Sequence, residues 1–197
     1  KNVIPFAQLG EQKLRRATYQ GPRKTIPSDK EISSADQHAN PLPVFGSSIA
    51  EYMTWQAETF KDFNNAIPKV LYCLGNMIIE LGGLTTEGIF RKPGSSREVE
   101  KLKDRLQSTG QLEIQKGLDS DDPHVLGSLF KLWLRELQDP IIPYTTYNAC
   151  IERANDQMVC IEVAKSIPLH NRNILCYVMK YLAKYIQPQY IAKTMMS

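Results

Sequence analysis

The chain has 197 residues, 42% of them apolar, and a formal net charge of +3. This length holds one well-packed domain with an extension, and the small net charge argues against bulk binding of nucleic acid, which favours strongly basic domains. A local basic patch for an anionic partner remains compatible with the composition. There is no signal-peptide pattern and no apolar run of about 18 residues, the length that spans a membrane. Because the first residue is lysine, we expect a fragment of a longer protein.

Residues 1–43 differ from the rest of the chain, since prolines recur at positions 5, 22, 27, 41 and 43 and apolar periodicity is weak. A polar, proline-rich stretch buries little surface, so a solvated linker is one interpretation. The other is a contact with acidic lipid or protein through residues 13–24. The basic residues of this segment, with no acid among them, are Lys13, Arg15, Arg16, Arg23 and Lys24. Ser28 and Glu31 have the spacing of a capping box and predict a short helix.

From residue 44 onward the apolar spacing is helical. The pattern predicts seven helices and no strand, so the fold class is all-α, with no internal repeat. The predicted helices cover about 48–63, 68–81, 95–110, 122–138, 145–154, 156–166 and 169–187. Ser95 and Glu98 form a second predicted capping box, and Pro188 is expected to end the last helix.

Two of these helices have wide apolar faces. The helix after Asp122 is predicted to lie at the centre of the core, because apolar residues cover more than half of its surface. We expect the last helix to bury Ile174, Leu175, Val178, Leu182, Tyr185 and Ile186. The four cysteines, Cys73, Cys150, Cys160 and Cys176, form no CxxC pair. They are therefore predicted to be reduced thiols, mostly buried, of an intracellular protein rather than zinc ligands.

The loop between the second and third predicted helices contains Arg91. Ile89 and Phe90 are large apolar residues that should anchor it in the core, and Lys92-Pro93-Gly94 should then turn the chain away. A guanidinium is planar, forked and permanently charged, which suits phosphate oxygens. An anchored loop that ends in such a cation predicts an arginine finger for another protein's phosphoryl-transfer site. The alternative is an ordinary solvated surface arginine.

The helix after Asp122 has a polar face as well. At 100° per residue, His124, Ser128, Lys131 and Arg135 lie on one side, with no acid between the two cations. This face is either an ordinary solvated basic surface or a pair of cations that meet an anionic partner or brace the Arg91 loop. Glu136 lies near the apolar edge, where a carboxylate needs a partner.

Two blocks of the sequence carry a family resemblance: TTEGIFRKPGS at residues 85–95 and PHVLGSLFKLWLRELQDPIIP at residues 123–143. They resemble the signature blocks of Rho-GAP domains, which are the GTPase-activating domains for Rho-family GTPases. The resemblance spans residues 44–197. It implies that Arg91 is the finger, that Lys131 and Arg135 line the GTPase-binding face, with Arg135 bracing the loop, and that Lys92 and Pro143 lie beside that face.

The resemblance also implies a function. The domain would stimulate GTP hydrolysis by Rac, Cdc42 or Rho in the cytoplasm, at a membrane or on the cytoskeleton. It would not be an enzyme itself and would hold no cofactor, since GTP and magnesium belong to the partner. The alternative is a module of the same fold that binds GTPases or other proteins without catalysis. Residues 23–32 resemble the end of a myosin-tail-homology domain, which precedes the Rho-GAP domain in Vilse/CrossGAP proteins, and this favours Rac and Cdc42.

The sequence departs from the family pattern at two places. Gln138 replaces a proline, at what should be a tolerant surface turn. The chain also stops at Ser197, before the family's NLAxxFxPN-type helix with its GTPase-contacting asparagine. We therefore expect a C-terminally incomplete domain that exposes part of its core.

Other chemistries fit poorly. There is no phosphate-binding GxxxxGK[ST] loop and no GxSxG nucleophile motif. His38, His124 and His170 lie far apart in the sequence and share no metal-ligand spacing. No metal site is predicted.

Overall fold

The computed structural model describes residues 43–117, 119–153 and 155–194, and these residues form helices and loops without a strand. All of them belong to one unit, residues 38–197. The predicted extension is residues 1–43, and all of it except Pro43 lies outside the described residues, including its basic segment and its predicted Ser28–Glu31 capping box. The all-α prediction is confirmed.

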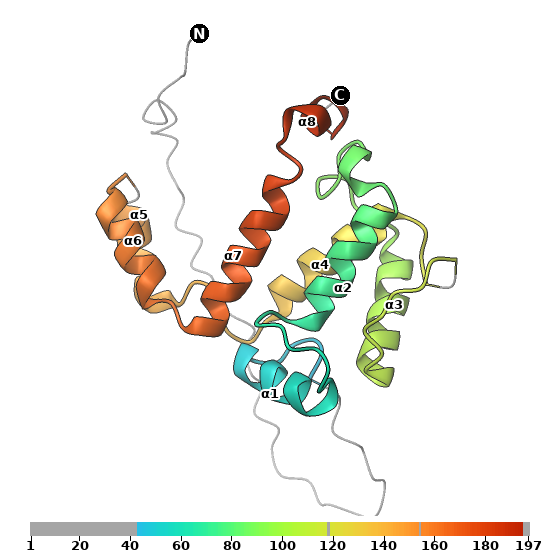
Figure 1. The fold of residues 1–197 in the computed structure, drawn as a ribbon, viewed down its shortest axis with the longest axis horizontal. Coiled ribbons are helices and arrows are strands. Elements are labelled where there is room, and N and C mark those ends of the chain that lie inside the picture. Colours follow the sequence, from blue (N-terminus) through green and yellow to red (C-terminus); the bar gives the residue numbers. More distant parts are fainter. Residues whose placement is uncertain (1–42, 118, 154, 195–197) are drawn as a thin grey trace, which may run out of the picture. The chain divides into compact units, whose positions relative to one another are not determined.

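Eight α-helices and one short 3-10 helix follow one another along the described chain (Figure 1). They are α1 (Ile49–Thr59), α2 (Lys69–Glu80), η2 (Gly83–Thr85), α3 (Ser96–Thr109), α4 (Pro123–Glu136), α5 (Tyr144–Glu152), α6 (Gln157–Ser166), α7 (Leu169–Ala183) and α8 (Pro188–Thr194). The seven predicted helices are all present, and α8 is additional.

The ends of two helices differ from the prediction. α1 stops at Thr59, four residues early. α7 stops at Ala183, because the N–H groups of Lys184 and Tyr185 bond carbonyls three residues back and tighten the chain into a turn. Pro188 therefore does not end a helix but begins α8, a position where its missing N–H has no consequence.

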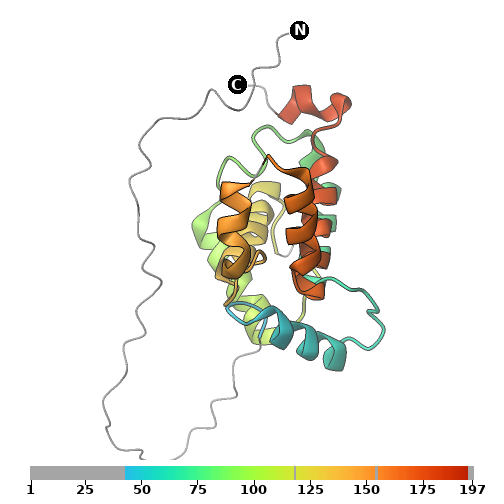
Figure 2. The ribbon, with the colours of Figure 1, turned by 90° about the vertical axis from the view of Figure 1, so that its left-hand side faces the viewer.

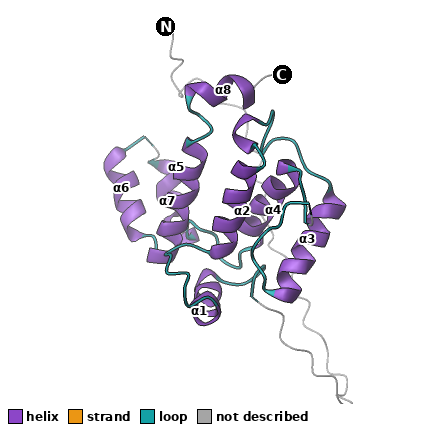
Figure 3. Ribbon diagram, turned by 45° about the vertical axis from the view of Figure 1, so that its right-hand side comes forward, coloured by secondary structure: helices purple, strands orange, loops and turns teal. Residues whose placement is uncertain are grey.

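The centre of the domain is the pair α2 and α4, with α3 packed on the other side of α4 (Figure 3). The fully buried side chains include Leu71, Leu74 and Ile78 of α2 and Leu126, Leu129 and Trp133 of α4. The Trp133 Nε1–H donates to the Val44 carbonyl at 2.7 Å and ties the segment before α1 to this core. α1 lies across one end of the other helices (Figure 2). The prediction of α4 as the central core helix is confirmed.

α7 contacts α2 along one narrow face. Tyr177 and Tyr181 donate their hydroxyl protons to the carbonyls of Leu71 and Gly75, each at 3.1 Å. Of the six residues predicted to be buried in the last helix, Ile174 and Tyr185 are buried, Leu175 and Val178 are half-buried, and Leu182 and Ile186 are exposed. Leu182 lies about 100° around α7 from Tyr181 and leaves the contact face, and Ile186 follows Tyr185 in the turn after α7. Their predicted burial is wrong.

Two further predictions need correction. Cys160 and Cys176 are exposed, because Cys176 lies about 200° around α7 from the buried Ile174. Cys73 is half-buried, and burial raises the pKa of its thiol to about 11. The predicted capping box of α3 does not form, since the Ser95 side chain makes no cap hydrogen bond and Glu98 instead accepts a bond from the Ser120 hydroxyl at 3.4 Å.

Candidate functional site

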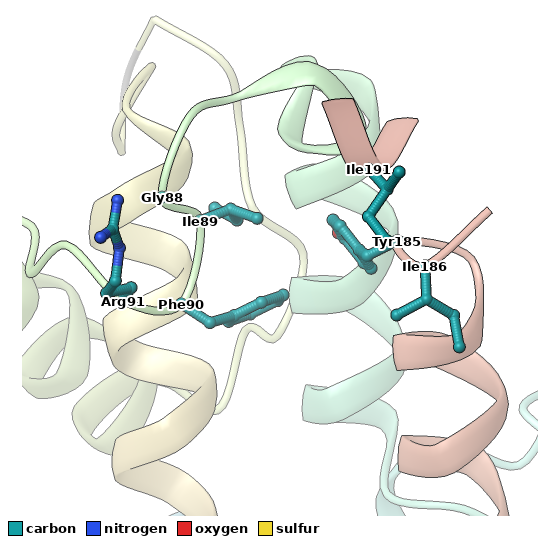
Figure 4. A pocket seen from close by; sticks show the side chains of 7 residues that line it. All are labelled: Gly88, Ile89, Phe90, Arg91, Tyr185, Ile186 and Ile191. Atoms are coloured by element: carbon teal, nitrogen blue, oxygen red, sulfur yellow. The ribbon is translucent and has the colours of Figure 1, made fainter. Parts of the chain in front are cut away.

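Residues 86–95, here called the Arg91 loop, connect η2 with α3. Ile89 is buried, and the Phe90 ring packs against the hydrophobic core. Figure 4 shows both side chains pointing from the loop towards Tyr185, whereas the Arg91 side chain points to the other side. Arg91 is exposed. The prediction that the two apolar residues anchor the loop is confirmed.

The backbone of the loop is a tight turn centred on one carbonyl. The Gly88 carbonyl accepts the N–H groups of Arg91 and Lys92 at 2.9 and 2.8 Å. Gly88 has a φ of 67°, which glycine adopts at no steric cost. Phe90 has a φ of 64°, and it is the single non-glycine residue with a positive φ in the part of the chain that the structure describes. Because this conformation costs roughly 1–2 kcal/mol in an L-residue, other contacts must hold Phe90.

α4 supplies contacts that hold the loop on both sides of Arg91. Before it, the Lys131 ammonium donates to the Phe90 carbonyl at 2.7 Å. After it, the Gly94 N–H donates to the Ser128 hydroxyl at 3.0 Å. Gly94 lies so close to α4 that a Cβ there would overlap the backbone of Val125. Lys131 and Ser128, on the polar face of α4, therefore brace the Arg91 loop.

An aromatic cluster holds the Phe90 ring from the other side. The ring centroid lies 5.3 Å from that of Tyr185 and 6.2 Å from those of Phe130 and Tyr181. Such pairs contribute about 0.5–1.5 kcal/mol each beyond their burial, so the three together match or exceed the backbone strain at Phe90. The apolar spacing of the last predicted helix indicates that Tyr185 is buried, but it does not connect Tyr185 to the loop. The i,i+4 spacing of Tyr181 and Tyr185 was the available signal.

A cleft of about 740 Å³ runs between α3 and α4 beside the loop. Pro93 and Gly94 form its loop side, and Lys103, Lys131 and Arg135 contribute cations. The remaining lining residues are Ser96, Val99, Glu100, Ser128 and Leu132. With three cations and one carboxylate, the lining is predominantly positive.

The predicted site residues are distributed unevenly around this cleft. Lys131 and Arg135 both line it and are both exposed, but the hydrogen bond to the loop comes from Lys131. The bracing role of Arg135 stays a prediction. Glu136, which needed a partner, pairs with Lys103 at 2.8 Å, as expected.

Lys92 and Pro143 differ from these two cations. The Lys92 side chain folds back over Gly88 and pairs with Glu87 at 2.7 Å, with both side chains about half exposed. The Pro143 carbonyl accepts the N–H and the hydroxyl of Thr146 at the start of α5. Pro143 is not among the residues that line the cleft. Their roles in binding stay predictions.

Within the described ranges, no group of three or more His, Cys, Asp or Glu side chains is placed to hold a metal ion. In the same ranges, no helix has the length and apolar character needed to cross a membrane. The site combines an exposed guanidinium on a braced turn with a cationic cleft.

Residues 68–197 match the family model of the RhoGAP domain. The chain belongs to the RhoGAP family. This RhoGAP domain is 34% identical over 161 residues to GTPase activating protein homolog 4 of Dictyostelium discoideum, covering 80% of the chain and 17% of that protein. It is 31% identical over 148 residues to human Rho GTPase-activating protein 24, covering 71% of the chain and 19% of that protein. It thus spans less than a fifth of the length of these relatives.

The crystal structure of human Rho GTPase activating protein 15 has the same fold, with a TM-score of 0.62 at 24% identity, over 78% of this chain and 71% of that one. The fold predicted from the two sequence blocks is therefore confirmed. The boundary at residue 44 and the resemblance of residues 23–32 to a myosin-tail-homology domain stay predictions.

Proposed function

We propose that this RhoGAP domain stimulates GTP hydrolysis by a Rho-family small GTPase, with Arg91 as an arginine finger supplied in trans. The observation that carries the proposal is the presentation of Arg91. It is exposed next to Phe90, whose ring is anchored in the core and whose carbonyl is held by Lys131 at 2.7 Å.

In this mechanism the GTPase holds the nucleotide, the magnesium ion and the attacking water. The domain needs no cofactor and performs no hydrolysis alone. The Arg91 guanidinium enters the partner's site and offsets the negative charge that develops on the transferring phosphoryl group. An arginine finger accelerates hydrolysis by about 10³–10⁵-fold, which corresponds to roughly 4–7 kcal/mol of barrier.

The braced turn explains how a single exposed arginine could lower the reaction barrier by this amount. A catalytic group acts best when its position is fixed before the reaction, because no free energy is then spent on reorganisation. In this domain the tight turn, the Phe90 anchor and the α4 brace fix the backbone from which the Arg91 side chain extends.

The cationic cleft provides the docking surface in this proposal. Lys103, Lys131 and Arg135 favour an acidic partner surface, and their long-range field speeds the encounter. Affinity should therefore fall as salt rises. We place the interaction in the cytoplasm, with Rac and Cdc42 as the preferred partners and residues 13–24 as an acidic-membrane contact.

The test is a single-turnover hydrolysis assay with saturating domain and GTP-loaded Rac, Cdc42 and Rho. We expect Arg91→Ala to lose about 10³-fold or more of the stimulation while it keeps most of its affinity. Arg97→Ala removes the same charge from an exposed position on α3 outside the cleft and should keep the saturating rate. An Arg91→Ala variant that stimulates as well as Arg97→Ala would disprove the finger.

The second candidate is a binding module without catalysis. It predicts that the parent domain binds a GTPase but leaves its hydrolysis rate unchanged. The exposed arginine on a strained, braced turn favours catalysis, since binding alone does not require a fixed conformation at Phe90. The same assay, combined with an affinity titration, separates the two candidates.

A further inference from the structure

We infer that Tyr185 is a positioning residue for Arg91, acting through the Phe90 ring. The inference rests on the proposed function for its effect on rate, and on the contacts of three helices for its geometry. It concerns residues on α7 and in the turn after α7, more than 80 positions beyond the loop in the sequence.

The Phe90 ring is closely packed on one side and borders a pocket on another. Beneath it lies Gly127 of α4, where an added Cβ would come within 3.4 Å of the ring. Beside it lies a pocket of about 310 Å³ lined by Ile89, Tyr185, Ile186 and Ile191, among others (Figure 4). Because this side contains open space, close packing does not fix the ring there. Tyr185 is the nearest aromatic ring to Phe90, at 5.3 Å and an interplanar angle of 77°.

Tyr185 is fixed by a hydrogen bond of its hydroxyl. It lies two residues beyond the end of α7, so the helix itself does not set its position. Its hydroxyl lies 2.8 Å from that of Tyr181. The Tyr181 proton is donated to the Gly75 carbonyl, so the proton between the two tyrosines comes from Tyr185. Burial raises the pKa of both hydroxyls, which keeps both protons in place at neutral pH.

These contacts form one continuous path from α2 to the loop. It runs from the Gly75 carbonyl through the Tyr181 and Tyr185 hydroxyls to the Tyr185 ring and the Phe90 ring. Phe90 carries the strained φ and directly precedes Arg91. Without the Tyr185 ring, Phe90 could move into the pocket and the turn would relax. The backbone from which the Arg91 side chain extends would then no longer be held in one position.

α7 contains a matched control. Tyr177 donates its hydroxyl proton to the Leu71 carbonyl at 3.1 Å, and its ring stacks on Tyr181 at 6.0 Å. Tyr177 thus has the same phenol side chain as Tyr185, eight residues earlier in the chain. The rings that pack on Phe90 are those of Phe130, Tyr181 and Tyr185. Tyr177→Phe removes a comparable bond without touching the path to the loop.

The experiment compares Tyr185→Phe, Tyr185→Leu and Tyr177→Phe by saturating hydrolysis rate, affinity for the GTPase and thermal unfolding. We expect Tyr185→Leu to lower the saturating rate about tenfold or more, since small misplacements in a preorganised site are costly. Tyr185→Phe keeps the ring but removes the hydroxyl that fixes it, so it should recover only part of that loss. Affinity should change less than twofold in both, and Tyr177→Phe should keep the parent rate.

A second readout does not depend on GTPase activation. Hydrogen exchange of the Arg91 and Lys92 amides, both bonded to the Gly88 carbonyl, should be faster in Tyr185→Leu than in Tyr177→Phe. Equal exchange and equal rates in the two variants would overturn the inference. If the parent domain fails to activate any GTPase, the proposed function fails, and the exchange comparison alone decides whether Tyr185 holds the loop.

Discussion

The Arg91 loop and the α5–α6 pair are held in opposite ways. The loop has little regular structure, yet α4, α7 and the turn after α7 fix it through hydrogen bonds and through the edge-to-face and tilted packing of aromatic rings on Phe90. α6 is a regular helix with a good cap, Asp156, whose side chain accepts the Met158 and Val159 N–H groups. It nevertheless buries only Val159 among its described side chains. Local signals suffice to form a helix, whereas the fixed position of an exposed side chain depends on contacts from distant segments.

The largest expected effect on stability compares a buried side chain behind the Arg91 loop with a side chain of α6. Phe130 is buried against the Phe90 and Tyr181 rings, and Phe130→Ala should destabilise the fold by about 3–5 kcal/mol. Ile161 on α6 is 39% exposed, and Ile161→Ala should change stability by less than about 0.5 kcal/mol. Urea unfolding measures both. Similar losses would show that α5–α6 contributes to the core as much as the loop region does.

The next effect concerns the close approach of the loop to α4. Gly94→Ala would force a Cβ against the Val125 backbone, which no side-chain rotation relieves. We expect a loss of about 1–3 kcal/mol, the range for overpacked sites. The neighbouring Ser95→Ala removes a hydroxyl that makes no cap bond and should have almost no effect. A neutral Gly94→Ala in the same urea series would mean that the loop separates from α4 easily.

A smaller effect distinguishes the two cations of α4. Lys131→Ala removes the bond to the Phe90 carbonyl and should lower the saturating hydrolysis rate about tenfold, because hydrogen bonds to charged groups contribute about 1.5–3 kcal/mol and this one is partly exposed. Arg135→Ala removes the same charge from the same cleft and should mainly weaken binding, more at low salt. This reverses the roles inferred from sequence. If Lys131→Ala changes only affinity, the turn does not need this brace.

The smallest effect lies far from the loop. A hydrogen bond from Lys69 holds the pKa of Glu113 below its usual value. The carboxylate therefore stabilises the fold above its unfolded pKa of about 4.3, and this stabilisation is lost as the pH falls through the lower folded value. Glu113 is largely exposed, so we expect a few tenths of a kcal/mol. The parent and Glu113→Gln should differ in unfolding free energy at pH 7 and converge near pH 3. A difference that persists at pH 3 would show that the ion pair is not its source.

Much of the fold could be predicted from sequence, because helix periodicity and caps are local. Asp122 and Ser48, which stand at the start of two of the predicted helices, cap them with their side chains. The failures are non-local. Ser95 and Glu98 have the right spacing, but Glu98 is engaged by Ser120 from the following loop. Leu182 and Ile186 are apolar but lie just outside the face that meets α2.

The candidate site shows the same contrast between local features, which could be predicted, and long-range contacts, which could not. Arg91 and its apolar anchors could be recognised in eleven consecutive residues. The hydrogen bond from Lys131, the contact of Gly94 with Val125 and the tyrosine path could not, because each joins segments at least 30 residues apart. Gln138 is instructive as well. Its N–H donates to the Ser47 carbonyl at 3.1 Å, a bond that the family's usual proline cannot make.

That bond and the one from Trp133 to the Val44 carbonyl attach the segment before α1 to the last turn of α4 and to the residues directly after it. A mechanical load on the chain before residue 43 would therefore be transmitted to the same helix that holds the Phe90 carbonyl. In surface immobilisation or force spectroscopy, an attachment at the N-terminal side would therefore apply force to α4, the helix that braces the Arg91 loop. An attachment on the exposed side of α6 would not apply force through these two bonds.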